Sequence, residues 1–492
     1  MTALTISFIM CTVFIVGVGL LSARRSTGTD EDYFLAGRKL GPWVAALSAS
    51  ASGSSGWVTM GLVGLGFSAG FRAYWLIPGV VFGIAFNWFV LAGKLRQQAA
   101  NLDALTIPDY LASKFNERLP LLRLLSVVVI LAAMFLYVAA QLAAAGKAFE
   151  ATFTGVDYKL GVGIGAAIIL TYTVLGGFRA ASWTDFAQGL LMLAVLVGLP
   201  VYLLVTQGGL GPVAAQLRKV DPALVRWAPA GVDSPLAIIG FLLGASALGI
   251  NFGYPGQPHV LVRYMALRDK REARIGGVIS VTWAALVYFG AITIGLFTRA
   301  ISEGGAPWGA DLLADPATKG ELALVVSTMH LTPGIFAGAA LAAILAAIAS
   351  TADSQLVVAG SAVAHDVYAR LIDRKRQRSH AAVNRIVVFT LGAGAALLVL
   401  DKDVRIYTYV LVYGWAMLGA AFGPQIALAA LWPRATYAGC LAGMATGFVV
   451  AIFWSRVYDA QATGVEAYNL TVAFFAALIV NVVISLFTAK KP

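Results

Sequence analysis

The sequence predicts an all-α polytopic membrane protein with about thirteen transmembrane helices. Hydrophobic residues make up 59% of its 492 residues and charged residues only 12%, about half the charged share of a soluble globular protein. Apolar runs long enough to cross a hydrocarbon core of about 30 Å recur along the whole chain. Because no Pro/Ser-rich linker or low-complexity tract separates them, we expect one transmembrane domain over residues 1–492.

The apolar runs define the expected spans in order. They cover residues 4–22, 42–68, 74–93, 123–149, 161–177, 183–206, 235–257, 275–300, 323–363, 383–400, 404–432, 436–456 and 468–488. The first run is followed, not preceded, by the basic pair Arg24–Arg25, which is the charge order of a first span whose N-terminus lies outside. The ninth run is too long for one straight span, so part of it must lie outside the core or tilt strongly.

The basic residues favour the same topology. With the N-terminus outside, 24 of the 35 Lys and Arg residues fall on the cytoplasmic side, as the positive-inside rule requires. The C-terminus is then cytoplasmic, and the expected location is the plasma (inner) membrane. This cytoplasmic surplus accounts for the net charge of +11, so we expect no nucleic-acid partner.

Two of the spans contain segments that disfavour a continuous helix. Span two holds "LSASASGSSGW" (47–57), where Ser competes for backbone hydrogen bonds and each Gly costs roughly 1 kcal/mol relative to Ala. Span seven holds "LGINFGYPGQPH" (248–259), where Pro255 and Pro258 each remove a helical N–H. Taken singly, these segments could be a small-residue packing seam and an ordinary Pro kink. They lie five spans apart, so if spans two to six and seven to eleven are inverted repeats, each break falls in the first helix of its repeat. That placement favours a transporter's binding site.

Span nine supplies a polar wall within an apolar run. Ser350, Asp353 and Ser354 share one helical face, and Thr351 stands beside it. Hydroxyl and carboxylate oxygens suit a hard cation such as sodium. The hydroxyls could instead bond to their own helix, but an acid in a span costs about 2.5–3.5 kcal/mol and is functional by default. Asp185, at the start of span six, could equally be an acid that favours a helix N-terminus.

No residue pattern typical of an enzyme or a zinc protein occurs. The His residues are scattered, and Cys11 and Cys440 lie far apart in apolar runs. We therefore expect no catalytic residues, no organic cofactor and no metal other than sodium. A membrane enzyme would need clustered His, Cys or carboxylates. A transporter-like membrane sensor, the other alternative class, would need an attached signalling domain, and we expect none.

Six motifs in register resemble the sodium:solute symporter family, and within it sodium/proline symporters. They are "YFLAGRKLGP" (33–42), "SGWVTMGL" (55–62), "SWTDFAQ" (182–188), "YPGQPH" (254–259), "STADSQLVV" (350–358) and "AAFGP" (420–424). The resemblance covers roughly residues 30–450. It implies a leucine-transporter-like 5+5 inverted-repeat core, with repeats over about 42–206 and 235–432, flanking helices at 4–22, 436–456 and 468–488, and sodium-driven alternating access.

The resemblance also implies three sets of site residues. The main sodium site falls on Ala51, Ser54, Ala347, Ser350 and Thr351. In family members with a second cation site, its positions match Asp185, Asp353 and Ser354. The substrate pocket would include Trp57, Tyr137, Asn251 and Tyr254.

The solute is left open by two departures from the pattern. Proline symporters carry Asp where this chain has Gly53, and Trp where it has Ile250. Asn251, beside the second change, could hydrogen-bond a more polar solute. We therefore expect sodium-coupled symport of a small organic solute, proline or another small amino acid, into the cytoplasm. Symport of a small carboxylate or betaine-like solute, and coupling to protons, stay as alternatives, and we expect a monomer in the lipid bilayer to be functional.

Overall fold

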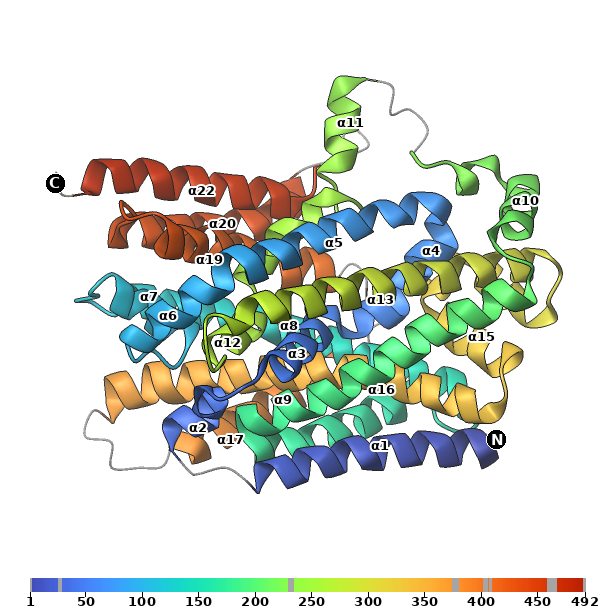
Figure 1. Cartoon of the computed structure of the whole chain (residues 1–492), viewed down its shortest axis with the longest axis horizontal. Coiled ribbons are helices and arrows are strands. Elements are labelled where there is room, and N and C mark those ends of the chain that lie inside the picture. The colour runs from blue at the N-terminus through green and yellow to red at the C-terminus, as the bar shows by residue number, and fades with distance from the viewer. Residues whose placement is uncertain are drawn as a thin grey trace.

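The computed structural model describes residues 2–24, 29–228, 234–373, 380–400, 406, 409–457 and 467–489. This described part is almost entirely helical and contains no strand, only an isolated bridge between Leu40 and Leu267. Ten of its helices are long and apolar enough to cross a membrane. They run alongside one another over the length of the molecule (Figure 1).

The ten helices differ from the thirteen expected spans in three places. Spans two and three join, the helix Tyr158–Val174 at span five is too short to be counted, and span seven is divided into short pieces. Expected spans two and three form one continuous helical stretch of 60 residues, Pro42–Asn101, which at 1.5 Å per residue is about 90 Å long and too long for one crossing. The chain reverses within it at η3, and Figure 1 shows the two halves running in opposite directions. The outgoing half is α3 (Pro42–Gly56), η2 (Trp57–Leu62) and α4 (Val63–Ala69); η3 is Gly70–Trp75; the returning half is α5 (Leu76–Ala85), η4 (Phe86–Ala92) and α6 (Gly93–Asn101).

Spans five and six join in the same way as α9 (Tyr158–Thr206). The helix is bent at Gly177, whose φ of 59° lies in the left-handed region that favours glycine. On either side lie a short apolar helix, Tyr158–Val174, and a candidate span, Gly177–Thr206. The bend thus separates two crossings that the sequence predicts as separate spans.

Spans two and seven are both interrupted, as the sequence predicts. In α3, Ser55 has φ 55° and ψ 178°, so the helix breaks there and continues as the π-helical stretch η2. Span seven is divided into three pieces, with Pro258 opening the last of them. These are α11 (Pro235–Leu242), η6 (Leu248–Gly256) and α12 (Pro258–Met265).

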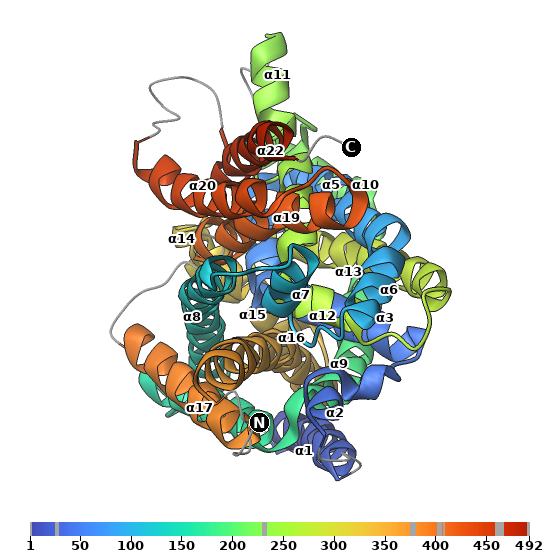
Figure 2. The same cartoon turned by 90° about the vertical axis from the view of Figure 1, so that its left-hand side faces the viewer.

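The ninth apolar run is also not one straight helix, which confirms the expectation from its length. It divides at Pro333 into α15 (Ala323–Leu331) and α16 (Gly334–Ser361), and α16 continues as η9 (Ala362–Ile372). The span containing α16 is 83% buried in its most apolar window, against 22% for α1. Alanine and glycine dominate α16, and such small residues allow neighbouring helices to approach closely. Viewed end-on, α16 lies among α3, α8, α9 and α12 (Figure 2).

The remaining elements complete the bundle around this centre. They are α1 (Thr2–Ala23), α2 (Asp30–Leu35), η1 (Ala36–Arg38), α7 (Ile107–Lys114), α8 (Leu121–Thr152), α10 (Leu210–Val220), η5 (Pro222–Val225), α13 (Glu272–Glu303), η7 (Pro307–Gly309), α14 (Ala310–Ala314), η8 (Lys319–Leu322), α17 (His380–Val399), η10 (Tyr409–Trp415), α19 (Ala416–Leu431), α20 (Tyr437–Val457) and α22 (Asn469–Thr488). α1 begins at one end of the bundle and α22 ends at the other (Figure 1). An odd number of crossings produces that arrangement.

Candidate functional site

The broken part of α3 packs directly against the hydroxyl-rich part of α16. The Ser350 hydroxyl donates to the carbonyl oxygens of Ala51, at 3.2 Å, and Ala347, at 3.1 Å. Thr351 donates to the carbonyl of Ser52 at 2.8 Å. The structure therefore brings together Ala51, Ala347, Ser350 and Thr351 from the expected main sodium site. All are buried, and carbonyl and hydroxyl oxygens of this kind are the ligands that a hard cation prefers.

Ser54, the fifth residue expected at this site, lies one turn further along α3. Its hydroxyl donates to the Ser50 carbonyl at 2.7 Å, a bond back to its own helix. Both residues also line a small cavity beside the break. Ser54 is thus near the other four residues, and its hydroxyl would have to rotate to meet a cation held by them.

The Asp185 carboxylate lies inside α9 and bonds to other helices, so it does not cap a helix N-terminus. Its Oδ2 accepts hydrogen bonds from Ser48 at 2.7 Å and from Ser52 at 3.0 Å, both on α3. The same oxygen accepts from Arg263 Nη2 on α12 at 2.8 Å. Asp185 is fully buried, so α3, α9 and α12 are held together through one carboxylate.

The other two residues of the expected second cation site lie beside Asp185. The Ser354 hydroxyl donates to Asp353 Oδ1 at 3.0 Å, and it lies 3.5 Å from Asp185 Oδ2. The remaining oxygens, Asp185 Oδ1 and Asp353 Oδ2, have no hydrogen-bond partner among the residues that the structure describes. The structure thus brings Asp185, Asp353 and Ser354 together in one buried cluster.

Arg263 is a site residue that sequence reasoning missed, because it was counted with the basic residues of a cytoplasmic loop. Its side chain is 0% exposed, and its guanidinium stacks over the Phe178 ring at 5.1 Å. It donates to Ser48 Oγ at 3.1 Å and also to Ser354 and the His259 carbonyl. One sequence signal could have found it: Arg263 lies within "HVLVRYM", where its immediate neighbours are apolar.

A small cavity of about 10 Å³ lies beside the α3 break. Tyr254, expected in the substrate pocket, lines it, and its hydroxyl is 3.5 Å from that of Tyr288. The expected Trp57 packs against the Tyr288 ring, with centroids 6.0 Å apart. The cavity lining consists of Ala49, Ser50, Gly53, Ser54, Ile84, Trp88, Tyr254, Val260, Tyr264 and Tyr288. Tyr288, on α13, was not foreseen, because a lone Tyr in a long apolar helix resembles a core residue.

Trp57, Tyr137 and Asn251, also expected in the substrate pocket, are not among the cavity-lining residues. The Tyr137 ring packs edge-on against His259, with centroids 6.3 Å apart. The Asn251 side chain donates to the Leu248 carbonyl of its own segment at 2.5 Å. A second unforeseen aromatic residue lies here: Trp415 packs edge-on against Tyr254, with centroids 4.8 Å apart, and donates to the Ile250 carbonyl.

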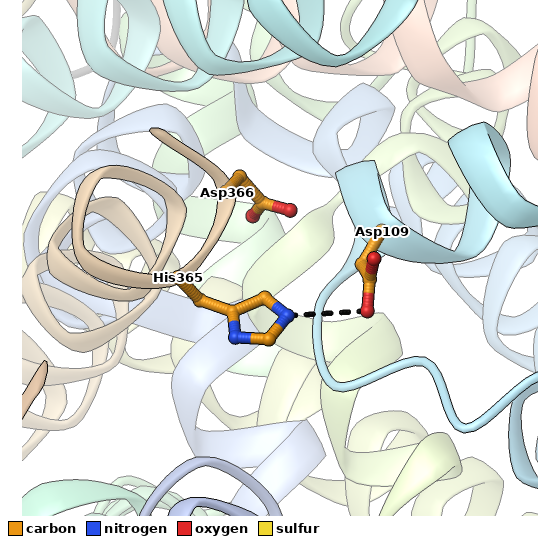
Figure 3. Close-up of side chains that lie close together, drawn as sticks. All are labelled: Asp109, His365 and Asp366. Carbon is orange, nitrogen blue, oxygen red and sulfur yellow. Dashed lines mark hydrogen bonds and ion pairs between the residues drawn. The ribbon is translucent and has the colours of Figure 1, made fainter. Parts of the chain in front are cut away.

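A second buried ionic cluster lies near the end of the bundle where α7 meets η9 (Figure 3). His365 Nε2 is 3.2 Å from Asp109 Oδ2, and Asp366 follows on the same helix. One ligand atom from each of these residues lies within 4.8 Å of the others, a spacing that could hold a metal ion. Arg123, however, contacts both carboxylates, at 2.9 Å to Asp109 and 2.6 Å to Asp366. Because Arg123 and Arg370 already pair with these acids, we interpret the group as an ion-pair network that ties α7 to α8 and η9.

Asp109 has a perturbed pKa in this network. Burial acts to raise the pKa of its carboxyl, but the hydrogen bond and charge of His365 and the charges of Arg123 and Arg370 outweigh it. The pKa of Asp109 is therefore held well below its usual range. The carboxylate stays ionised, and α7 stays bonded to η9, over the whole physiological pH range.

A broken helix packed against hydroxyls on a central helix, with an aromatic cavity beside the break, defines an ion-coupled secondary transporter. Comparison with known proteins agrees with this class. The model of the sodium:solute symporter family matches residues 33–447. The chain belongs to the sodium:solute symporter family.

Relatives and solved structures resemble the chain over most of its length. It is 35% identical to the osmoregulated proline transporter OpuE of Bacillus subtilis, over 96% of this chain and 92% of the relative. It is 37% identical to the sodium/proline symporter of Escherichia coli, over 90% of this chain and 86% of the relative. A structure of a Na⁺-coupled sialic acid symporter matches with a TM-score of 0.77 at 19% identity, covering 100% of this chain and 99% of that one. MhsT in complex with L-phenylalanine matches with a TM-score of 0.52 at 15% identity, covering 90% and 98%.

Several expectations from the sequence are thereby confirmed. The fold is the leucine-transporter-like inverted-repeat fold, and the chain is a multi-pass membrane protein. It is a sodium-coupled symporter and not an enzyme, and sodium is its coupling ion. The matched range, 33–447, contains both broken spans and α16.

Proposed function

We propose that this chain carries proline, or a closely similar small amino acid, into the cytoplasm together with sodium. The observation that carries the proposal is the shared position of two features on α3. Ala51 contacts Ser350 of the candidate sodium site, while Ser50, Gly53 and Ser54 of the same turns line the aromatic cavity. An ion and a solute bound to the same broken helix segment would each favour one conformation of that segment, which is the physical basis of coupling.

The lining of the cavity supports a small, partly apolar solute. Its free volume of about 10 Å³ holds no more than about one water molecule, so the surrounding side chains would have to move apart to admit a solute. Tyr254, Tyr288 and Trp88 supply aromatic faces, and Ser50 and Ser54 supply hydroxyls. Trp415 packs against Tyr254 and donates to the Ile250 carbonyl. Its indole therefore lies beside the position at which proline symporters carry Trp. This uncharged, aromatic lining suits a proline-like solute better than a strongly charged one, and the named relatives at 35% and 37% identity are proline transporters.

The sodium ion would bind between α3 and α16. We propose the carbonyls of Ala51 and Ala347 and the hydroxyls of Ser54, Ser350 and Thr351 as its ligands. In this structure the three hydroxyls donate to backbone carbonyls. To coordinate a cation, each hydroxyl would rotate so that an oxygen lone pair points towards the ion. Asp185, Asp353 and Ser354 form the proposed second cation site. All of these ligands come from one chain, which supports a functional monomer.

The proposed orientation has the C-terminus in the cytoplasm and the N-terminus outside, in the inner membrane. The loops beside α6, α7 and α12 lie at the end of the bundle where α22 ends (Figure 1). Arg96, Arg118, Arg268 and Lys270 all belong to this end. The positive-inside rule makes the more basic end cytoplasmic.

Uptake into proteoliposomes tests the proposal. Purified protein in vesicles with an inward sodium gradient should accumulate radiolabelled proline, and an equal potassium gradient should drive no accumulation. Unlabelled glycine betaine and a small carboxylate serve as competitors, because they represent the alternative solutes. Stronger inhibition of labelled-proline uptake by glycine betaine or by the carboxylate than by unlabelled proline would identify a different substrate, and uptake driven by a proton gradient alone would identify a different coupling ion.

A further inference from the structure

The buried cluster around Asp185 contains a cation that belongs to the protein itself. Arg263 Nη2 lies 2.8 Å from Asp185 Oδ2, and both side chains are 0% exposed. The same nitrogen donates to the Ser354 hydroxyl, and Arg263 Nε donates to Ser48 at 3.1 Å. Asp185 and Ser354 are two of the three groups proposed for a second cation. The guanidinium therefore lies within bonding distance of the oxygens that a second cation would need.

We infer that the Arg263 guanidinium occupies the second cation site as a tethered cation, and that it thereby limits the symporter to one bound sodium ion. The inference rests on the proposed sodium site at Ser350 and Thr351. It gives Arg263 a role in setting the ion stoichiometry of transport, beyond holding α12 against α3 and α9.

The charges of the cluster support this assignment. When both carboxyls are ionised, Asp185 and Asp353 contribute two negative charges and Arg263 one positive charge, and all three groups are buried. Asp353 lies one helical turn beyond Ser350 on α16, so a single sodium ion at the main site brings the cluster to zero net charge. A second sodium ion would leave one excess positive charge in a water-poor interior, where uncompensated charge is strongly disfavoured.

The guanidinium is also suited to permanent occupancy. An arginine side chain keeps its charge at every physiological pH and offers several donors in a fixed plane. Here those donors reach Ser48 on α3, Asp185 on α9 and Ser354 on α16. A sodium ion would have to compete with a charge fixed on α12 for the same oxygens. Removing the guanidinium while keeping the acids should therefore create a sodium site where none is available in the wild-type protein.

Equilibrium binding of ²²Na⁺ to the purified full-length protein in lipid nanodiscs tests the inference by counting bound ions. We expect the wild-type protein to bind one sodium ion. Arg263→Gln, which leaves two acids without the guanidinium, should bind two, with the sodium Hill coefficient of proline uptake rising above one. The double variant Arg263→Gln with Asp185→Asn retains one acid, so its count should return to one.

Arg299→Gln is the matched control. Arg299 is also largely buried and ion-paired, to Glu303 at 2.9 Å on α13, but it belongs to neither cation site. The Arg299→Gln protein should bind one sodium ion, like the wild-type protein. This control separates the loss of a particular charge from the general effect of removing a buried arginine.

The possible results separate this inference from the proposed function. Two ions bound by the wild-type protein, or one ion bound by folded Arg263→Gln, would overturn the role of Arg263 while leaving sodium symport intact. A wild-type protein that binds no sodium would contradict the proposed function and, with it, the inference. If Arg263→Gln does not fold, the number of sodium ions bound by the wild-type protein and by the double variant Arg263→Gln with Asp185→Asn still tests the inference. A second bound sodium ion in either protein overturns it.

Discussion

The Ser350 hydroxyl on α16 and the Ala51 carbonyl on α3 are hydrogen-bonded at 3.2 Å, at the point where α3 is about to break. This contact joins the interrupted helix to one of the two most buried candidate spans among the described residues. A movement of α3 away from α16 would separate the two groups of sodium ligands. Sodium binding would therefore favour the conformation in which α3 and α16 are packed together.

The first prediction concerns these hydroxyls. Replacing Ser350 and Thr351 together by Ala should raise the half-saturating sodium concentration of proline uptake roughly tenfold or more, because each neutral ligand contributes about 0.5–1.5 kcal/mol. The affinity for proline at saturating sodium should change much less. The measurement is uptake as a function of sodium concentration at fixed membrane potential.

Ser361→Ala is the control for that experiment. Ser361 is buried on the same helix, and its hydroxyl donates to the Val358 carbonyl, at 2.8 Å. It should leave the sodium dependence of uptake as in the wild-type protein. An unchanged sodium dependence in the double Ala variant would mean that the ion binds elsewhere.

A second prediction follows from the placement of the loops at the two ends of the bundle. In a background without Cys11 and Cys440, single cysteines replacing Asp157 and Arg271 should react from opposite sides of the membrane. Both positions are exposed, and Arg271 should be labelled from the cytoplasm because the positive-inside rule places its basic loop there. A membrane-impermeant maleimide applied to right-side-out and inside-out vesicles measures this. Labelling of both positions from the same side would refute an odd number of membrane crossings between Asp157 and Arg271.

The third prediction concerns the close packing of the second broken span. A Cβ added at Gly253 would overlap the Trp415 indole, so Gly253→Ala should lower the free energy of unfolding by about 1–3 kcal/mol through overpacking. A Cβ added at Gly163 would have no neighbouring atom within 4 Å, and Gly163→Ala is the matched control. Thermal unfolding in detergent compares the two. Equal stability of both variants would show that η6 can shift away from Trp415 at little cost.

The breaks could be predicted from the sequence because their causes are local. Ser and Gly in span two, and Pro255 and Pro258 in span seven, weaken a helix wherever they occur. The polar face of α16 could also be predicted, since Ser350, Thr351 and Asp353 follow helical spacing. The family resemblance then placed Ala51 and Ala347 beside them, which no local pattern could have done.

Other parts of the site could not be predicted, because they depend on how distant segments pack. In the sequence, Arg263 resembles a loop residue. It is buried beside Asp185 because α12 packs against α3. In the sequence, Tyr288 and Trp415 resemble core residues. Their position near Tyr254 and its cavity depends on the break in α3. Asn251 is polar and adjoins a departure from the family pattern, yet its amide bonds to its own segment through Leu248.

The fourth prediction concerns pH and the Asp109 network. The pKa of Asp109 is depressed in the folded protein by His365, Arg123 and Arg370, which outweigh the effect of burial. The stability it contributes is therefore fully present above the unfolded value of about 3.9 and is lost only as the pH falls through the lower, folded value. Asp109 stays ionised between pH 5 and 8, so over this whole range Asp109→Asn should lose the pairs with Arg123 and Arg370, at about 3–5 kcal/mol for a broken buried pair. Melting temperatures across this pH range measure it.

An exposed ion pair provides the comparison for Asp109. Asp311 pairs with Lys319 at the surface, where such a pair contributes about 0–1 kcal/mol, so Asp311→Asn should change the melting temperature little. A cost for Asp109→Asn no larger than this would contradict the role given to the network. A cost that disappears by pH 5 would contradict the depressed pKa.

The last prediction concerns the solute. Tyr254 lines the cavity and places its hydroxyl 3.5 Å from that of Tyr288, so Tyr254→Phe removes one polar group from the pocket and keeps the ring. The half-saturating proline concentration should rise up to about tenfold, as expected for one neutral hydrogen bond, while the maximal rate and the sodium dependence stay close to wild type. Tyr110→Phe removes a buried hydroxyl that donates to Gln98 at 2.8 Å, outside the cavity, and should leave proline affinity unchanged. Equal effects of the two substitutions on proline affinity would place the solute somewhere other than this cavity.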